Sequence, residues 1–235
     1  GLRISSTKIL FIDDLIKNNF FATIFTIFCL LILINGSNFL DGLNTLVVGY
    51  YILVILIITY LVSYHQINFN VHFFQYLIIS LFVILFFNFF SKIYLGDSGV
   101  FLLSLIVGSE LITLSNANLY TVKFISPMFI VLLLWYPAFE NLFSIVRRSY
   151  NKIHPAHPDN KHLHQLIFIF IKKNLINNNF TNSISAIVIN FYNLIIFLIG
   201  LRFISNSISL SYLLIINILV YIFCYNFFLK KNKTR

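Results

Sequence analysis

Charged side chains are scarce in this chain. Lys, Arg, Asp and Glu together make up 10% of its 235 residues, whereas a soluble domain carries about 25% charged residues. Hydrophobic residues account for 59%, and the mean hydropathy is +0.90. This composition argues against a soluble globular protein and for a polytopic membrane protein.

Cysteine is also scarce, and no signal peptide is recognisable. Cys29 and Cys224 both lie in apolar runs, so they support neither a disulfide framework nor a cysteine metal site. The net charge of +9 could indicate a nucleic-acid partner. However, the basic residues lie in loops that flank apolar segments, and the positive-inside rule explains that pattern better. We therefore expect no nucleic acid among the partners.

Apolar runs of about 20 residues, the length that spans a bilayer, predict an all-α transmembrane bundle. Residues 1–235 are interpreted as a single integral-membrane domain whose longest polar stretch is a cytoplasmic loop, 145–182. Pro137 and Glu140 lie in the fifth run, so this span is expected to kink or end early. The seven predicted spans are 20–37, 43–63, 71–91, 99–116, 122–144, 183–201 and 207–229.

The start of the chain, residues 1–19, is interpreted as a loop. Because Gly1 stands in place of an initiator Met, we expect the chain to be the C-terminal part of a longer protein.

Three short polar islands interrupt the apolar sequence. They cover residues 38–42, 95–99 and 158–164, and they contain three of the seven carboxylates: Asp41, Asp97 and Asp159. Acids at the ends of membrane helices are costly unless they have a function. Together with two histidines, Asp41 and Asp97 indicate a metal-dependent phosphoryl-transfer site.

Counting predicted spans places all three islands on one side of the membrane. Two spans separate Asp41 from Asp97, and two more separate Asp97 from His162. Eleven of the sixteen Lys and Arg residues fall on that side, which makes it the cytoplasmic side. The pair Asp13–Asp14 lies only one span before Asp41, so it is interpreted as an exposed acid pair on the opposite side.

The first two islands each have a structural and a functional interpretation. Asp41, at the opening of the second span, could be a simple helix N-cap, but Asn38 and Asn44 flank it, and an N-cap needs only one oxygen-bearing side chain. Asp97, in Gly-Asp-Ser-Gly, could cap a helix or bind a hard metal ion, and the two roles are compatible. Gly96 and Gly99 would let a phosphate approach closely, and a helix N-terminus favours an anionic pyrophosphate.

The third island lies in a basic loop with four histidines within eleven residues. Zinc is disfavoured, because the spacing matches no zinc motif and no cysteine is nearby. His154 and His157 are interpreted as part of a solvated loop. His162 and His164, beside Lys161, suit the binding of a diphosphate.

Taken together, the islands resemble those of the bacterial polyprenyl-phosphate N-acetylhexosamine-1-phosphate transferases, glycosyltransferase family 4. The family's Asn-x-x-Asn-x-x-Asp-Gly segment corresponds to residues 35–42. Its Gly-Asp-Ser/Thr-Gly segment, with an upstream Asn, corresponds to residues 96–99 and Asn88. Its Pro-Asp-x-x-His-x-His segment, preceded by an Arg-Arg pair, corresponds to residues 158–164.

The sequence departs from the family pattern at four places. Val100 stands where Ser or another small residue is common. Asn44 stands where the family usually has Asp, which puts a second carboxylate role there in doubt. Thr45 stands where the family has Gly. The family's earlier Asp-Asp motif is not matched, since Asp13–Asp14 should face the wrong side, so we expect that motif upstream of Gly1.

The resemblance implies transfer of a sugar 1-phosphate, of N-acetylhexosamine type, from a UDP-sugar to polyprenyl (undecaprenyl) phosphate, with release of UMP. This reaction would begin cell-envelope polysaccharide synthesis at the cytoplasmic face of the bacterial inner membrane. The implied cofactor is Mg²⁺, with Mn²⁺ as an alternative, and homo-oligomerisation stays open. Asp97 is expected to be catalytic and to bind the metal, and Asp41 to be catalytic as a base or a neighbour of the metal. Substrate-binding roles are expected for Asn38, Asn44, Asn88, Lys161, His162 and His164.

Two alternatives stay open. A membrane transporter would also place polar residues inside a helical bundle, but its acids should lie near mid-membrane, whereas Asp41 and Asp97 lie at span ends. A catalytically inactive fragment or scaffold of the same family is the other alternative.

Overall fold

The computed structural model describes residues 1–65, 69, 72–118, 125–152, 159, 161–175 and 180–233. The described residues form α-helices connected by short loops, with no strand among them. The expected all-α polytopic bundle is therefore confirmed. Six helices are long and apolar enough to cross a membrane: α2 (Asn19–Leu40), α3 (Leu46–His65), α4 (His72–Phe89), α5 (Gly96–Asn118), α9 (Thr181–Leu201) and α10 (Ser207–Lys233).

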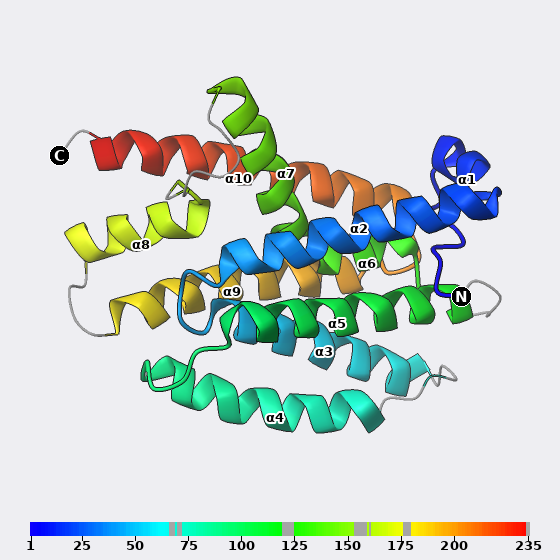
Figure 1. Cartoon of the computed structure of the whole chain (residues 1–235), viewed down its shortest axis with the longest axis horizontal. Coiled ribbons are helices and arrows are strands. Elements are labelled where there is room, and N and C mark those ends of the chain that lie inside the picture. The colour runs from blue at the N-terminus through cyan, green and yellow to red at the C-terminus, as the bar shows by residue number, and fades with distance from the viewer. Residues whose placement is uncertain are drawn as a thin grey trace.

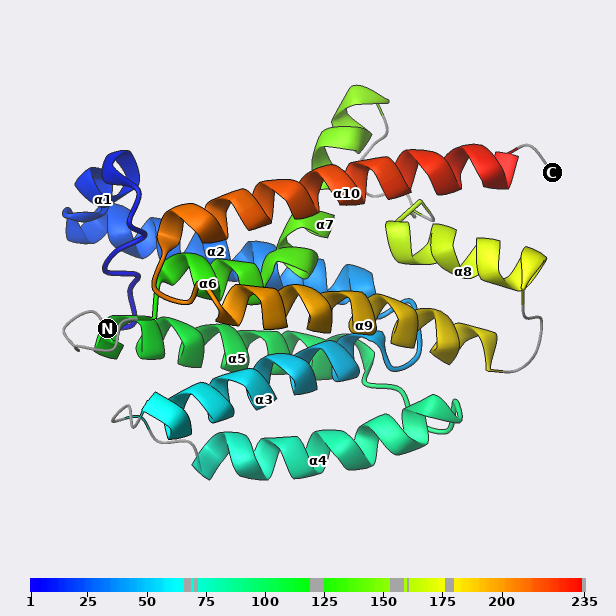
Figure 2. The same ribbon diagram turned by 180° about the vertical axis from the view of Figure 1, so that it is seen from behind.

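The long helices lie side by side in one bundle (Figures 1 and 2). One end, here called the island end, holds the end of α2, the start of α5 and the short helix α8 (Leu163–Asn174). The opposite end holds α1 (Leu10–Ile16), the end of α3, the start of α4 and the α9–α10 connection. The helix α3 forms the centre, with 67% of its span buried, whereas only 17% of the α4 span is buried. The apolar outer faces of helices such as α4 suit contact with lipid.

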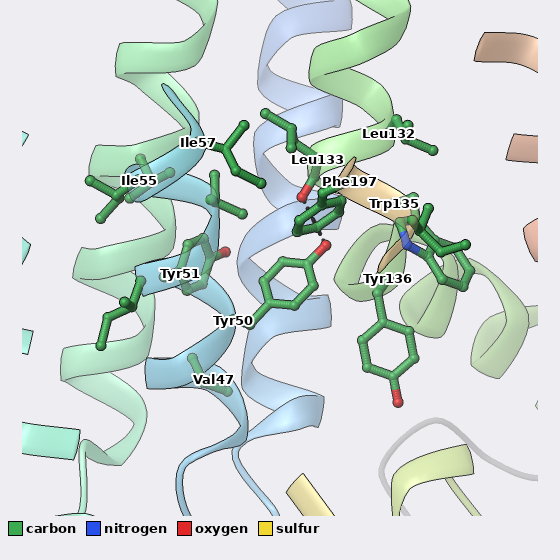
Figure 3. Packing of buried hydrophobic residues seen from close by; sticks show 14 of the residues in the cluster. Val47, Tyr50, Tyr51, Ile55, Ile57, Leu132, Leu133, Trp135, Tyr136 and Phe197 are labelled. Atoms are coloured by element: carbon green, nitrogen blue, oxygen red, sulfur yellow. Dashed lines mark hydrogen bonds between the residues drawn. The ribbon is translucent and has the colours of Figure 1, made fainter. Parts of the chain in front are cut away.

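The predicted fifth span, 122–144, is not one straight helix. Its described part forms α6 (Pro127–Leu133) and α7 (Trp135–Tyr150), which are bent by 71°. Pro137 has no N–H to donate to the carbonyl of Leu133, four residues earlier. The hydroxyl of Tyr50 donates to that carbonyl instead, at 2.8 Å (Figure 3). The expectation that this span kinks or ends early is confirmed.

The helix α7 leaves the bundle steeply and crosses α2 on the way (Figure 1). The crossing is very close, because a Cβ placed on Gly36 of α2 would lie 1.9 Å from the carbonyl oxygen of Pro137. The side chain of Asn141 also donates to the carbonyl of Ile32, at 3.1 Å. Gly36 therefore lets α7 pass directly beside the last turns of α2, next to the first island.

Two loop expectations need correction. Residues 1–19 include α1, which is held by Asp13: its carboxylate accepts from the backbone N–H of Thr7 at 2.6 Å and the hydroxyl of Ser6 at 2.8 Å. Asp14 forms an exposed ion pair with Lys17 at 2.6 Å. Both acids lie at the α1 end, away from the islands, as expected. The polar stretch 145–182 contains the end of α7 and all of α8, because its apolar residues form a helix face that packs on α9 and α10.

Candidate active site

The three islands meet at the island end of the bundle. Asp41 caps the C-terminus of α2, Asp97 lies in the first turn of α5, and His162 caps the N-terminus of α8. The expected N-cap position of Asp41 is therefore wrong, because α2 extends to Leu40 and α3 begins only at Leu46. The ring of Phe39 lies 5.0 Å from that of His162, measured between centroids. The expectation that span parity brings the islands to one side is confirmed in the geometry of the bundle.

Asp41 and Asp97 form a pair of neighbouring carboxylates. Asp41 is half-buried, and Asp97 is exposed. Burial first, and then the negative charge of Asp97, raise the pKa of Asp41 to about 6. The charge of Asp97 therefore acts on Asp41, and both acids lie at helix ends, whereas their catalytic role stays a prediction.

Asn44 and Asn88 hold the loops around this pair. The side-chain carbonyl of Asn88 accepts from the backbone N–H of Thr45, and its amide donates to the carbonyl of Ile93 at 2.7 Å. The side chain of Asn44 donates to the hydroxyl of Ser91 at 2.6 Å. Both amides therefore tie the α2–α3 turn to the α4–α5 loop. Asn38 contributes its carbonyl, which accepts from the backbone N–H of Asp41 at 3.2 Å.

In the third island, Asp159 forms an ion pair with Arg147 of α7. Burial alone would raise the pKa of Asp159, but the charge of Arg147, that of His162 and two hydrogen bonds outweigh it and hold the pKa below its ordinary value. These bonds come from the backbone N–H of Lys161 at 3.1 Å and the hydroxyl of Ser144 at 3.1 Å. The ion pair fixes the island onto α7 and leaves the Lys161 residue exposed.

His162 and His164 are buried, with exposed fractions of 4% and 0%. The Nδ1 atom of His162 lies 2.8 Å from a carboxylate oxygen of Glu140, and the two imidazole rings stack at 5.5 Å. Neither ring offers surface to a ligand in this arrangement, so direct substrate binding by them stays a prediction. His154, His157 and Pro158 lie outside the described residues.

The ring of His164 points at the first island. Among the described residues, neither of its nitrogens has a hydrogen-bond partner. Its Nε2 atom would lie 3.1 Å from a Cβ placed on Gly42. Burial, helped by the charge of His162 and opposed by that of Glu140, lowers the pKa of His164 to about 4. His164 is therefore a neutral ring at neutral pH, directly behind the turn that carries Asp41.

Sequence reasoning gave no site role to Glu140 or Arg147. Glu140 is fully buried and also accepts from the hydroxyl of Tyr221 at 2.7 Å. A carboxylate inside a predicted span needs a partner, and that signal could have paired Glu140 with one of the histidines. For Arg147, the signal in the sequence was the Arg-Arg pair before the third island, which could have indicated a partner for Asp159.

The donor set at Asp41 and Asp97 suits a magnesium ion. Within the described ranges, no three His, Cys, Asp or Glu side chains lie together as a metal site. Mg²⁺, however, is usually bound by one or two carboxylates together with substrate phosphates and water, not by a cage of protein ligands. An exposed carboxylate beside a half-buried one fits that mode.

Comparison with known proteins places these features in a family context. Residues 1–115 match the model of glycosyl transferase family 4. The chain is also similar to the probable undecaprenyl-phosphate N-acetylglucosaminyl 1-phosphate transferase of Bacillus subtilis (strain 168), with 27% identity over 172 residues. That match covers 72% of this chain and 47% of the relative, so the chain spans about half the length of the curated relative it matches. No solved structure matches.

Proposed function

Because residues 1–115 match the model of glycosyl transferase family 4, we propose that this chain transfers a sugar 1-phosphate from a UDP-sugar to polyprenyl phosphate and releases UMP. The sugar is of the N-acetylhexosamine type, and the reaction begins the synthesis of a cell-envelope glycan. One observation carries the proposal: Asp41, Asp97 and the start of α8 meet at one end of a membrane bundle.

In this reaction, an oxygen of the lipid phosphate attacks the phosphorus that bears the sugar. A new P–O bond forms there, and the bond from that phosphorus to the bridging oxygen breaks. The bridging oxygen leaves with UMP and carries the developing negative charge. A phosphate monoester is already partly ionised at pH 7, so a strong base is not required.

The carboxylates have separate tasks. Asp41, with a pKa of about 6, is mostly ionised at neutral pH and can take a remaining proton from the lipid phosphate. Asp97, exposed at the start of α5, would hold Mg²⁺, with Asp41 beside it. When bound, the ion would offset charge on the pyrophosphate.

Groups with positive potential lie at the same end of the bundle as the pair. The N-terminus of α5 presents free backbone N–H groups, and Gly96 reaches it with φ of 68°, a conformation that glycine adopts without strain. Lys161 is exposed at the start of the third island. Both features favour a diphosphate at the island end. The basic residues of the third island support a cytoplasmic location for this end.

The test uses the purified protein in liposomes that contain undecaprenyl phosphate. A UDP-N-acetylhexosamine labelled in the sugar is added with Mg²⁺, and labelled lipid and UMP are measured. We expect equal amounts of both products, and their loss in Asp97→Asn, which keeps the side-chain size but removes the charge. Asp14→Asn, an exposed acid at the other end, is the matched control and should stay active.

The same liposomes test the transporter alternative. Label that enters the lumen as intact UDP-sugar, without labelled lipid, would contradict the proposed transfer. The absence of both lipid product and uptake would favour the inactive-scaffold alternative.

A further inference from the structure

Glu140 joins three helices at the island end, and the reaction as described above gives it no task. It lies on α7 and is fully buried. One carboxylate oxygen lies 2.8 Å from Nδ1 of His162, at the start of α8, and the other accepts from the hydroxyl of Tyr221, on α10, at 2.7 Å. Both oxygens therefore have a partner on a different helix.

Stability alone is a weak explanation for a carboxylate at this position. Removing a charged pair from water is costly, and well-packed apolar side chains of similar volume often stabilise a protein as much or more. A buried ionic contact instead fixes geometry, because its hydrogen bonds have defined lengths and directions. The question is which geometry Glu140 fixes.

The contacts lead from Glu140 to the turn that carries Asp41. His162 is the N-cap of α8, and its backbone N–H donates to the side chain of Gln165 at 3.2 Å. Its ring stacks on that of His164, whose Nε2 faces Gly42. The other charged groups beside His162 are Asp159, at 3.7 Å from Nε2, and Arg147, which is paired with Asp159. Of the described residues, only Glu140 contacts the opposite ring nitrogen, Nδ1.

We propose that Glu140 is a positioning residue of the active site: by holding His162 it fixes the start of α8, and with it His164, against the Asp41–Gly42 turn. The inference rests on the proposed function, because the position it fixes matters through the transfer reaction. Glu140 itself touches neither reacting group.

Two substitutions separate this role from simple packing. Glu140→Gln keeps the size but removes the charge, so it replaces the charge-assisted contact with His162 by a weaker neutral one. Glu140→Asp keeps the charge on a shorter side chain. We expect Glu140→Gln to lower kcat about a hundredfold, the scale of a small misplacement in an active site, with a much smaller change in KM. Glu140→Asp should recover part of that loss, and both variants should keep the wild-type melting temperature within a few degrees.

The matched control is Glu110→Gln. Glu110 is the other glutamate of the chain, and it also lies within a span, on α5, away from the islands. It should leave kcat unchanged. Equal kcat values for Glu140→Gln and the wild type would overturn the proposal. So would a loss that Glu140→Asp does not recover at all.

A second measurement works whether or not the protein shows transfer. Diethyl pyrocarbonate modifies accessible imidazoles, and mass spectrometry locates the modified residues. In the detergent-solubilised wild type, His162 and His164 should be protected, while the exposed His72 reacts. Glu140→Gln should increase modification of His162 and His164 at least several-fold with His72 unchanged. If His162 and His164 stay protected in Glu140→Gln, the positioning role is overturned. If the wild type shows no transfer but the histidines become modified in Glu140→Gln, the result counts against the proposed function alone.

Discussion

The backbone N–H of Thr45 donates to the side-chain carbonyl of Asn88, and this bond holds a threonine at φ of 67°. Side chains branched at Cβ rarely adopt that conformation. The Thr45 hydroxyl is buried without a hydrogen-bond partner. Thr45 is the position where the family pattern has glycine, so the structure gives that departure a physical consequence: a strained residue four positions after Asp41.

Thr45→Gly should stabilise the protein. Strain of this kind costs about 1–3 kcal/mol, and glycine removes it while losing about 0.5–1 kcal/mol through backbone entropy. We expect a net gain of about 1 kcal/mol, measured as a higher melting temperature. Thr59→Gly is the control, because Thr59 lies within α3 and its substitution should destabilise. A fall in melting temperature for Thr45→Gly would contradict the strain.

Asn88→Ala should destabilise the protein by about 2–3 kcal/mol, because it leaves the buried N–H of Thr45 and the carbonyl of Ile93 without partners. The melting temperature of the purified protein in detergent measures this loss. Asn174→Ala, at an exposed residue, is the control. An unchanged melting temperature together with a higher KM for the UDP-sugar would instead assign Asn88 the substrate-binding role predicted from sequence.

Gly36→Ala should disrupt the crossing of α2 and α7. The added methyl group would lie 1.9 Å from the carbonyl oxygen of Pro137, and a backbone atom cannot move aside as a flexible side chain can. Overpacking of this kind costs about 1–3 kcal/mol or more, and α7 would shift away from the island end. Melting temperature and transfer should both fall. Asn35→Ala, at the exposed neighbouring position, should change neither.

Asp41 should make the stability of the protein depend on pH. Its pKa is about 6 in the folded protein and 3.8 ordinarily, so the protonated form favours folding, and this contribution is lost as the pH rises through about 6. Asp41→Asn stays neutral at every pH. Its melting temperature should exceed that of the wild type more at pH 7.5 than at pH 5, in Mg²⁺-free buffer. Ser98→Ala is a control that removes no titrating group. Its melting temperature should differ from that of the wild type by the same amount at both pH values. If the difference in melting temperature between Asp41→Asn and the wild type does not change with pH, the raised pKa of Asp41 is contradicted.

The sequence was sufficient to predict the spans and the meeting of the islands. An apolar run long enough to span a bilayer has few alternative structures there. Counting the spans between Asp41, Asp97 and His162 places all three residues on the same side of the membrane. The position of a break is harder to predict. Pro137 predicted a kink, but the break lies at Leu134. The hydroxyl of Tyr50, which is distant in sequence, donates to the carbonyl of Leu133, which Pro137 leaves without its helical partner.

Burial of the third island could not be predicted from its polar sequence. The polar neighbours of His162 and His164 favoured the interpretation of both histidines as exposed ligands of the substrate. Their burial depends on a carboxylate at Glu140, on stacking with Phe39, and on α8 packing against two distant helices. Such contacts are set by the tertiary structure, and no local pattern contains them.

The two ends of the bundle should be accessible from opposite sides of the membrane. The Asp14 side chain is 70% exposed at the α1 end, and Ser98 is exposed at the island end. Single Asp14→Cys and Ser98→Cys substitutions would be made after Cys29 and Cys224 are replaced by serine. In intact spheroplasts, an impermeant thiol reagent should modify only the Asp14→Cys variant, and Ser98→Cys should react once the membrane is permeabilised. The positive-inside rule is the reason, since the third island, with Lys161, lies at the same end of the bundle as Ser98 and should face the cytoplasm. Modification of Ser98→Cys in intact cells would place the proposed active site outside, where cytoplasmic UDP-sugars do not reach it.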